Sequence, residues 1–247
     1  MYPPAGLAAL DPLPTRWASI SYRCLRPRQM KRLQQWRSPD GVRGYSIHSA
    51  EAQGTIFVHV PKCGGSAISK SLFGTAKIGH LSLRQYRIMY GARHFERLFR
   101  FAFVRNPWDR LVSAFHYLRA GGVNEYDARW SERNLAGFDD FGTFVREWIP
   151  GRDLGKTYWH LVPQKDFLCV KEGGMDLDFV GRLESVEEDL ARLVDLGGVN
   201  PVAPLQRINA SRRRRDWRSY YDDETAAIVE EAYATDIRLL GYDFESA

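Results

Sequence analysis

The stretch TIFVHVPKCGGSA, residues 55–67, decides the fold of this chain. Its opening run is rich in β-branched and aromatic residues, which predicts a short strand. Pro61 and the pair Gly64 and Gly65 then predict a tight turn, and residues 66–72 have the pattern of a helix start. We therefore expect a strand, a glycine-rich loop and a helix in direct succession.

The same succession recurs along the chain. The run FAFV at residues 101–104 predicts a second strand, which ends before Asn106 and Pro107, and apolar residues then repeat at helical spacing as far as Leu118. A third apolar run lies at residues 177–180. Strands that alternate with helices predict an α/β fold, in which a P-loop-like parallel central sheet is flanked by helices and the ligand lies at the carboxyl ends of the strands.

Two further helices are predicted in the second half of the chain. The third apolar run leads into a helix for which Ser185 and Glu188 predict a capping box, and the glycine pair at residues 197–198 predicts its end. A last helix is expected over residues 222–240. Helical spacing places three of its apolar side chains on one face: Val229, Tyr233 and Ile237.

Length and composition exclude disorder and a minimal scaffold. A chain of 247 residues with 44% apolar side chains has room for a full core, which makes disulfide or metal staples unnecessary. Its three cysteines have no metal-ligand spacing, so we expect no metal site. The net charge of +5 favours an anionic ligand. We divide the chain into a basic, peripheral N-terminal arm, residues 1–50, and one domain, residues 51–247.

The start of the chain lacks the pattern of a secretory signal, and no stretch approaches about 18 uninterrupted apolar residues. We therefore expect a soluble cytoplasmic protein. The arm is expected to form short helices and loops, and its arginines between residues 23 and 43 leave a peripheral membrane contact open.

The loop at residues 61–67 has the chemistry of a phosphate cradle. Glycines let backbone N–H groups turn towards an anion, the following helix adds its dipole, and Lys62 supplies a mobile charge. The order of a Walker A loop is absent, because the lysine precedes the glycines. An ordinary tight turn between strand and helix explains this loop equally well when it is taken alone.

The second strand also ends in residues suited to an anion. Arg105 can grip a phosphate with two parallel N–H groups, and Ser113 lies about two helical turns later, where its hydroxyl can meet the same anion. Asp109 and Arg110 are expected to form a surface or inter-element salt bridge instead. Trp108 is expected in the core.

Together the two segments resemble the sulfotransferases, in particular the carbohydrate sulfotransferase group that includes heparan sulfate 2-O-sulfotransferases. The likeness extends through PQKDFL at 163–168, DFVGRLE at 178–184 and GYDF at 241–244. It implies the sulfotransferase fold and a sulfuryl donor, 3′-phosphoadenosine 5′-phosphosulfate (PAPS). The 5′-phosphosulfate would lie on the first loop, whose binding residues would be Lys62, Cys63, Gly64, Gly65, Ser66 and Ala67. The 3′-phosphate would lie on Arg105 and Ser113. Cys63 stands where many relatives have threonine.

A histidine is expected to act as the general base. His80 matches the region where this group of sulfotransferases places it, and imidazole titrates near the working pH. His160 and His116 are weaker candidates, and an aspartate or glutamate base stays open. His59 is expected to be a core histidine that braces the loop, and His94 is expected on the surface.

A basic segment at residues 207–216 is the last candidate region. An exposed, solvated loop is the usual explanation of four consecutive arginines. The resemblance implies instead that Asn209, Ser211 and one or two of the arginines at 212–214 contact the nucleotide or the acceptor.

The sequence thus predicts a sulfotransferase that transfers the sulfuryl group of PAPS to a hydroxylated acceptor, expected to be a glycan, by in-line displacement. His80 would accept the proton, Lys62 would neutralise the leaving nucleotide, and no metal or nucleic acid would take part. Two other classes remain open: a P-loop-type nucleotide kinase or NTPase, and a non-enzymatic basic binding protein. The sequence leaves the acceptor's identity and the oligomeric state undetermined.

Overall fold

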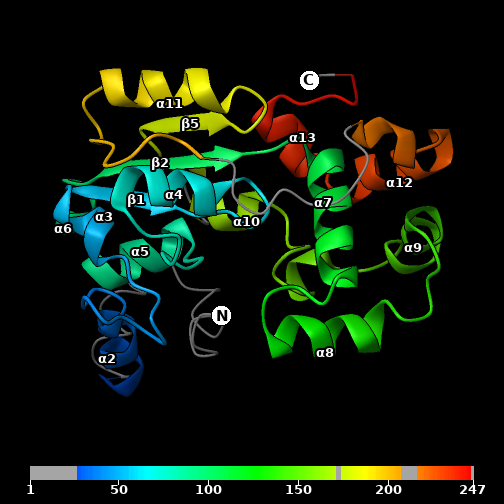
Figure 1. The fold of residues 1–247 in the computed structure, drawn as a ribbon, viewed down its shortest axis with the longest axis horizontal. Coiled ribbons are helices and arrows are strands. Elements are labelled where there is room, and N and C mark those ends of the chain that lie inside the picture. Colours follow the sequence, from blue (N-terminus) through cyan, green and yellow to red (C-terminus); the bar gives the residue numbers. More distant parts are fainter. Residues whose placement is uncertain (1–26, 171–173, 207–215, 246–247) are drawn as a thin grey trace. The chain divides into compact units, whose positions relative to one another are not determined.

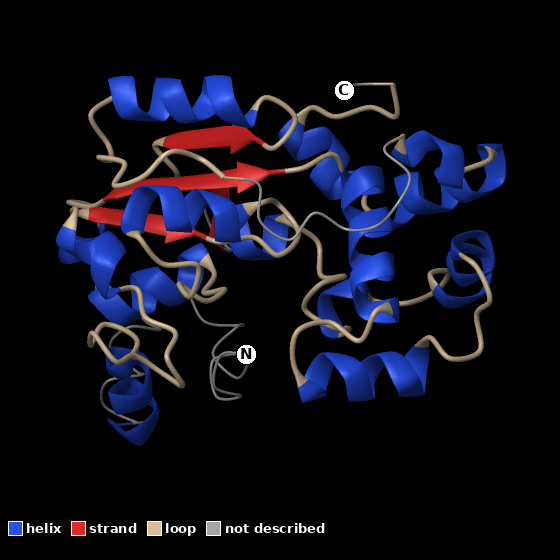
Figure 2. Ribbon diagram, viewed as in Figure 1, coloured by secondary structure: helices blue, strands red, loops and turns tan. Residues whose placement is uncertain are grey.

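The computed structural model describes residues 27–170, 174–206 and 216–245, and the chain divides into two compact units. Unit 1 comprises Met1–Val104 and Asp166–Ile208, and unit 2 comprises Arg105–Lys165 and Asn209–Ala247. Unit 1 holds a parallel sheet, whereas the regular elements in the described part of unit 2 are helices (Figures 1 and 2).

The sheet of unit 1 has three parallel strands in the order β1 (Thr55–Val58), β2 (Phe99–Val104) and β5 (Phe179–Arg182). Phe101 is the register partner of Phe57 on one side and of Phe179 on the other. Figure 1 shows the three arrows side by side with helices around them. This arrangement confirms the predicted α/β class with a parallel central sheet and is consistent with the sulfotransferase fold.

Both faces of this sheet are buried. One face packs against α4 (Gly65–Phe73) and α11 (Val186–Asp195) in a single apolar cluster that includes Phe57 and Phe101. On the opposite face Ile56 and Val58 are almost fully buried as well. Continuous apolar strands are typical of parallel sheets covered on both faces, and for this reason residues 55–58 and 101–104 could be recognised as strands.

Shorter elements complete unit 1. They are α2 (Pro27–Gln35), α3 (His48–Ala52), α5 (Leu83–Tyr90), α6 (Ala92–Phe95), β3 (Cys169–Val170) and β4 (Gly174–Met175), with α10 (Lys165–Leu168) beginning at the last residue of unit 2. Leu33, Trp36 and Ile47 are almost fully buried, so the described residues before position 50 share in the packing of unit 1. The division into an arm and one domain stays a prediction.

Unit 2 is built around α7 (Pro107–Arg119), where Pro107 occupies the first helical position and the side chain of Asn106 accepts a hydrogen bond from the N–H of Trp108. Its other elements are α8 (Glu125–Asn134), α9 (Phe141–Trp148), η2 (Leu154–Lys156), η3 (Trp217–Tyr220), α12 (Asp223–Ala232) and α13 (Ala234–Leu240). Trp108 is buried in an aromatic core together with Phe115 and Phe144, which confirms its predicted position.

Two local predictions were wrong. Ser185 does precede α11, but its hydroxyl donates to the carboxylate of Asp189 at 2.8 Å and makes no capping hydrogen bond. The helix predicted over 222–240 is broken into α12 and α13 at Tyr233, whose backbone is non-helical and whose hydroxyl donates to the carbonyl of Leu161. Val229 and Tyr233 are both buried, as their spacing predicted. Among the described helices, none is long and apolar enough to span a membrane.

Candidate functional site

The loop between β1 and α4 is strained and closely packed. Lys62 has a φ of 70° and Gly64 a φ of 73°, so a lysine adopts the left-handed conformation that normally favours glycine. Such a conformation costs about 1–3 kcal/mol and persists where the surroundings impose it, most often at functional sites. The Lys62 side chain is half-buried, and Cys63 beside it is buried.

Two contacts explain why the loop requires glycines. A Cβ atom at Gly64 would lie 2.5 Å from a methyl carbon of Leu183, in addition to the strain of its positive φ. A Cβ atom at Gly65 would lie 2.0 Å from Cδ2 of His59. His59 is buried, which confirms the prediction that it is a core histidine. Its ring lies against Gly65 of the loop.

The loop leads directly into the N-terminus of α4. Gly64 is its N-cap, and the N–H groups of Ala67 and Ile68 donate to the Gly64 carbonyl at 3.0 and 3.2 Å. N–H groups in the first turn of a helix point out of its end, and the helix dipole adds partial positive charge there. The structure therefore combines a half-buried lysine with a helix N-terminus, as an anion cradle requires.

His80 lies against His59 with ring centroids 4.1 Å apart. Its Nδ1 atom is 2.7 Å from the backbone carbonyl of His59. Because a carbonyl oxygen only accepts hydrogen bonds, Nδ1 carries the proton, and a neutral His80 has its lone pair on Nε2. His80 is half-buried.

Arg105 and Ser113 lie in unit 2, and both are largely buried. The Nε and Nη2 atoms of Arg105 bind one oxygen of Asp109, at 2.7 and 2.6 Å. The expected salt bridge is present at Asp109, whose partner is Arg105, the residue that lies two positions before α7. Neither Asp109 nor Arg110 lies on the surface: both are buried, and Arg110 donates to the carbonyl of Val162.

His160 belongs to a buried network in unit 2. Its Nε2 lies 3.5 Å from Asp127, whose carboxylate also accepts hydrogen bonds from Tyr117 and Tyr158. Burial by itself raises the pKa of Asp127, but the hydrogen bonds from His160, Tyr158 and Tyr117 outweigh it and hold that pKa well below its usual range. This network gives His160 a structural partner. His94 is exposed, as predicted.

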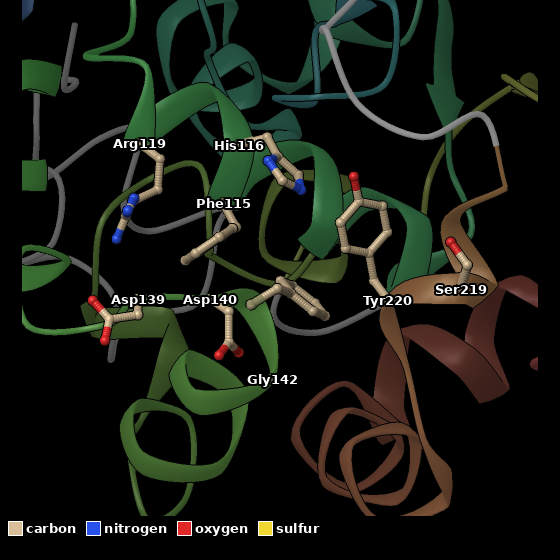
Figure 3. A pocket seen from close by; sticks show the side chains of 9 residues that line it. Phe115, His116, Arg119, Asp139, Asp140, Gly142, Ser219 and Tyr220 are labelled. Carbon is tan, nitrogen blue, oxygen red and sulfur yellow. The ribbon is translucent and has the colours of Figure 1, made fainter.

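Unit 2 also contains a pocket of about 450 Å³ (Figure 3). Its walls are aromatic: Phe115 packs against Phe141, and His116 meets Tyr220 edge to face with centroids 4.9 Å apart. The pocket is lined by Phe115, His116, Arg119, Asp139, Asp140, Phe141, Gly142, Ser219 and Tyr220. Of the predicted histidines, His116 is the one that reaches it. The sequence did not predict the other lining residues, because the pocket is formed by three segments that are far apart in the chain.

The carboxylate of Asp140 forms part of this pocket and also caps α9. The backbone N–H of Thr143 donates to it and lowers its pKa, so Asp140 is ionised at neutral pH. The Arg119 guanidinium is held by the carbonyls of Leu135 and Phe138. The pocket therefore offers aromatic faces, fixed carboxylate acceptors and one cation.

The remaining predicted residues, Asn209, Ser211 and the arginines at 212–215, lie outside the described residues. Within the described residues, no group of three or more histidine, cysteine, aspartate or glutamate side chains could hold a metal ion.

The chain matches a known protein family. The family model described as "Sulfotransferase family" matches residues 47–243, which covers most of both units. No curated protein and no solved structure matches the chain.

Proposed function

Because the chain belongs to the sulfotransferase family and is therefore a sulfotransferase, we propose that it transfers the sulfuryl group of PAPS to a carbohydrate hydroxyl, with His80 as the general base. The observation that carries this proposal is the hydrogen bond from His80 Nδ1 to the His59 carbonyl, at the base of the glycine loop. This hydrogen bond holds His80 against the residue that follows β1 and precedes the glycine loop.

The loop residues bind the 5′-phosphosulfate of the donor. Lys62 supplies the positive charge, and the N–H groups of Gly64, Gly65 and Ser66 supply the cradle, because the N–H of Ala67 already donates to the Gly64 carbonyl. The strained φ of Lys62 supports this role, since it fixes the backbone from which the side chain starts. The buried Cys63 shapes the loop, and its Sγ lies 3.7 Å from the Pro61 carbonyl.

In the chemical step the acceptor oxygen attacks sulfur while His80 Nε2 takes the hydroxyl proton. The bond between sulfur and the bridging oxygen of the nucleotide breaks, and that oxygen keeps the electron pair. Lys62 neutralises the charge that develops there, which is stabilisation directed at the transition state. The products are a sulfate ester and 3′-phosphoadenosine 5′-phosphate (PAP).

Arg105 and Ser113 bind the 3′-phosphate in this proposal. A largely buried guanidinium held by Asp109 is already oriented before the phosphate arrives, which reduces the conformational entropy lost on binding. Arginine suits this task, because its planar fork pairs with phosphate through parallel N–H groups.

The pocket of unit 2 supports a carbohydrate acceptor. The partly exposed rings of His116 and Tyr220 can pack against the apolar faces of sugar rings, and the carboxylates of Asp139 and Asp140 can accept hydrogen bonds from hydroxyls. The resemblance to carbohydrate sulfotransferases points to the same class of acceptor.

Thermal unfolding with PAP, AMP, ADP and ATP with Mg²⁺ tests the nucleotide part. PAP is expected to raise the unfolding temperature most, because the other nucleotides lack the 3′-phosphate. A larger shift with ATP and Mg²⁺ would favour a nucleotide kinase or NTPase and would contradict the proposal. Transfer of ³⁵S from labelled PAPS to a panel of desulfated glycans tests the acceptor class.

A further inference from the structure

We propose that Gln164 is a positioning residue for nucleotide selection: it locks the backbone of Arg105, so that the guanidinium distinguishes nucleotides that carry a 3′-phosphate from those that do not. This inference rests on the proposed function. It adds to it a residue that never touches the nucleotide and acts through Arg105.

The side chain of Gln164 binds both backbone groups of Arg105. Its Oε1 accepts from the Arg105 N–H at 3.0 Å, and its Nε2 donates to the Arg105 carbonyl at 2.7 Å. Gln164 is fully buried, so water does not compete for these bonds. A side-chain amide thus pairs with Arg105 as a neighbouring strand would, at the residue directly after the end of β2.

Gln164 is itself held by a buried carboxylate. Asp236 accepts hydrogen bonds from the backbone N–H of Gln164 at 2.6 Å and of Lys165 at 2.8 Å, and it is fully buried. Burying a carboxylate is costly unless hydrogen bonds compensate for the lost water. Here they fix the backbone at the position from which the Gln164 side chain reaches Arg105.

Arg105 is therefore held at two points. Gln164 fixes its backbone, and Asp109 fixes one edge of its guanidinium through Nε and Nη2. A planar guanidinium held in one orientation binds two phosphate oxygens better than a mobile one, because little conformational entropy remains to be lost. Loss of the hydrogen bonds between Gln164 and the Arg105 backbone should therefore weaken the binding of the 3′-phosphate and leave the binding of the rest of the nucleotide unchanged.

The test compares the dissociation constants of PAP and AMP, measured by isothermal titration calorimetry on the full chain. In Gln164→Met, which keeps the side-chain length and removes both hydrogen bonds, we expect PAP to bind about tenfold more weakly and AMP to bind as before. In the Arg105→Ala background, Gln164→Met should cause no further loss of PAP affinity, because the residue through which it acts is gone.

Gln53 offers a matched control in unit 1. Its amide binds both backbone groups of Asn200, with the Asn200 N–H at 2.9 Å and the Asn200 carbonyl at 3.2 Å. Gln53→Met should lower the unfolding temperature without changing the ratio of PAP to AMP affinity. If Gln164→Met does not fold, Gln164→Asn provides the same test: it stays uncharged, its shorter side chain cannot reach both backbone groups of Arg105, and it should reduce the same ratio.

The possible results distinguish a failure of the inference on Gln164 from a failure of the proposed function. A selective loss of PAP affinity that disappears in the Arg105→Ala background supports the inference. The inference is overturned, while the proposed function stands, if Gln164→Met weakens the binding of PAP and AMP equally or weakens neither. It is also overturned if the loss of PAP affinity persists in the Arg105→Ala background. A wild-type protein that binds PAP no better than AMP overturns both.

Discussion

The close approach of Gly65 to His59 predicts that Gly65→Ala destabilises the wild-type chain but stabilises a chain in which His59 is replaced by alanine. In the wild-type chain, the methyl group of Gly65→Ala would lie 2.0 Å from Cδ2 and 2.3 Å from Nε2 of the buried His59 ring. Overpacking of this kind costs about 1–3 kcal/mol. Because Gly65 is the first residue of α4, the higher helix propensity of alanine offsets up to about 1 kcal/mol of that cost.

His59→Ala removes the ring and, with it, the clash. This substitution alone should destabilise the chain by about 2–4 kcal/mol, because it leaves a cavity beside Phe57 and His80. In that background only the helix propensity of the new alanine remains, and its methyl group fills part of the cavity. Gly65→Ala should then stabilise the protein, by up to about 1 kcal/mol.

Thermal unfolding of the four variants measures this reversal, since about 1 kcal/mol corresponds to roughly 2–4 °C in a chain of this size. Gly142→Ala, in the first turn of α9 in unit 2, is the matched control and should change stability equally with and without His59. Equal destabilisation by Gly65→Ala in both backgrounds would refute the packing of His59 beneath the loop.

Three further predictions concern the proposed chemistry and the buried network. His80→Ala should lower turnover by about 10²–10⁴-fold with little change in PAP affinity, and unchanged turnover would place the base elsewhere. Arg105→Ala should weaken PAP binding by about ten- to a hundredfold, as calorimetry would show, and binding at wild-type strength would disprove its phosphate contact. Folding lowers the pKa of Asp127, so its ionised form stabilises the folded chain above its unfolded pKa of about 3.9, and that stability is lost as pH falls through the lowered value. Asp127→Asn should therefore unfold at a lower temperature at neutral pH and lose less stability on acidification between about pH 5 and pH 3; parallel pH profiles would contradict this.

Local signals in the sequence were sufficient for the elements that carry the site. The apolar runs at 55–58 and 101–104 are strands, and each is followed by the predicted helix. These junctions could be predicted because proline, glycine and asparagine mark them within a few residues. The candidate loop and Arg105 follow from the same signals. These predictions needed no knowledge of distant contacts.

The features that were missed depend on distant contacts. No glycine or proline marks the break at Tyr233, whose hydroxyl donates to the carbonyl of Leu161, 72 positions away. Asp236 binds the N–H of Gln164 across the same separation. The role of Gln164 was missed for the same reason, since Arg105 is 59 positions from it. Likewise, the tautomer of His80 is determined by a backbone carbonyl, which no side-chain pattern reveals.

Two costly features of the chain, one in each unit, involve residues that hold a proposed nucleotide-binding cation. Lys62 bears a strained φ, and Asp236 buries a carboxylate that supports Gln164 and, through it, Arg105. A lysine at positive φ is unfavourable by itself, and a buried carboxylate is tolerated only because hydrogen bonds compensate for the lost water. Both features fix the backbone of a proposed cation before the ligand arrives. The strained lysine and the buried carboxylate therefore support the proposed roles of Lys62 and Arg105 in anion binding.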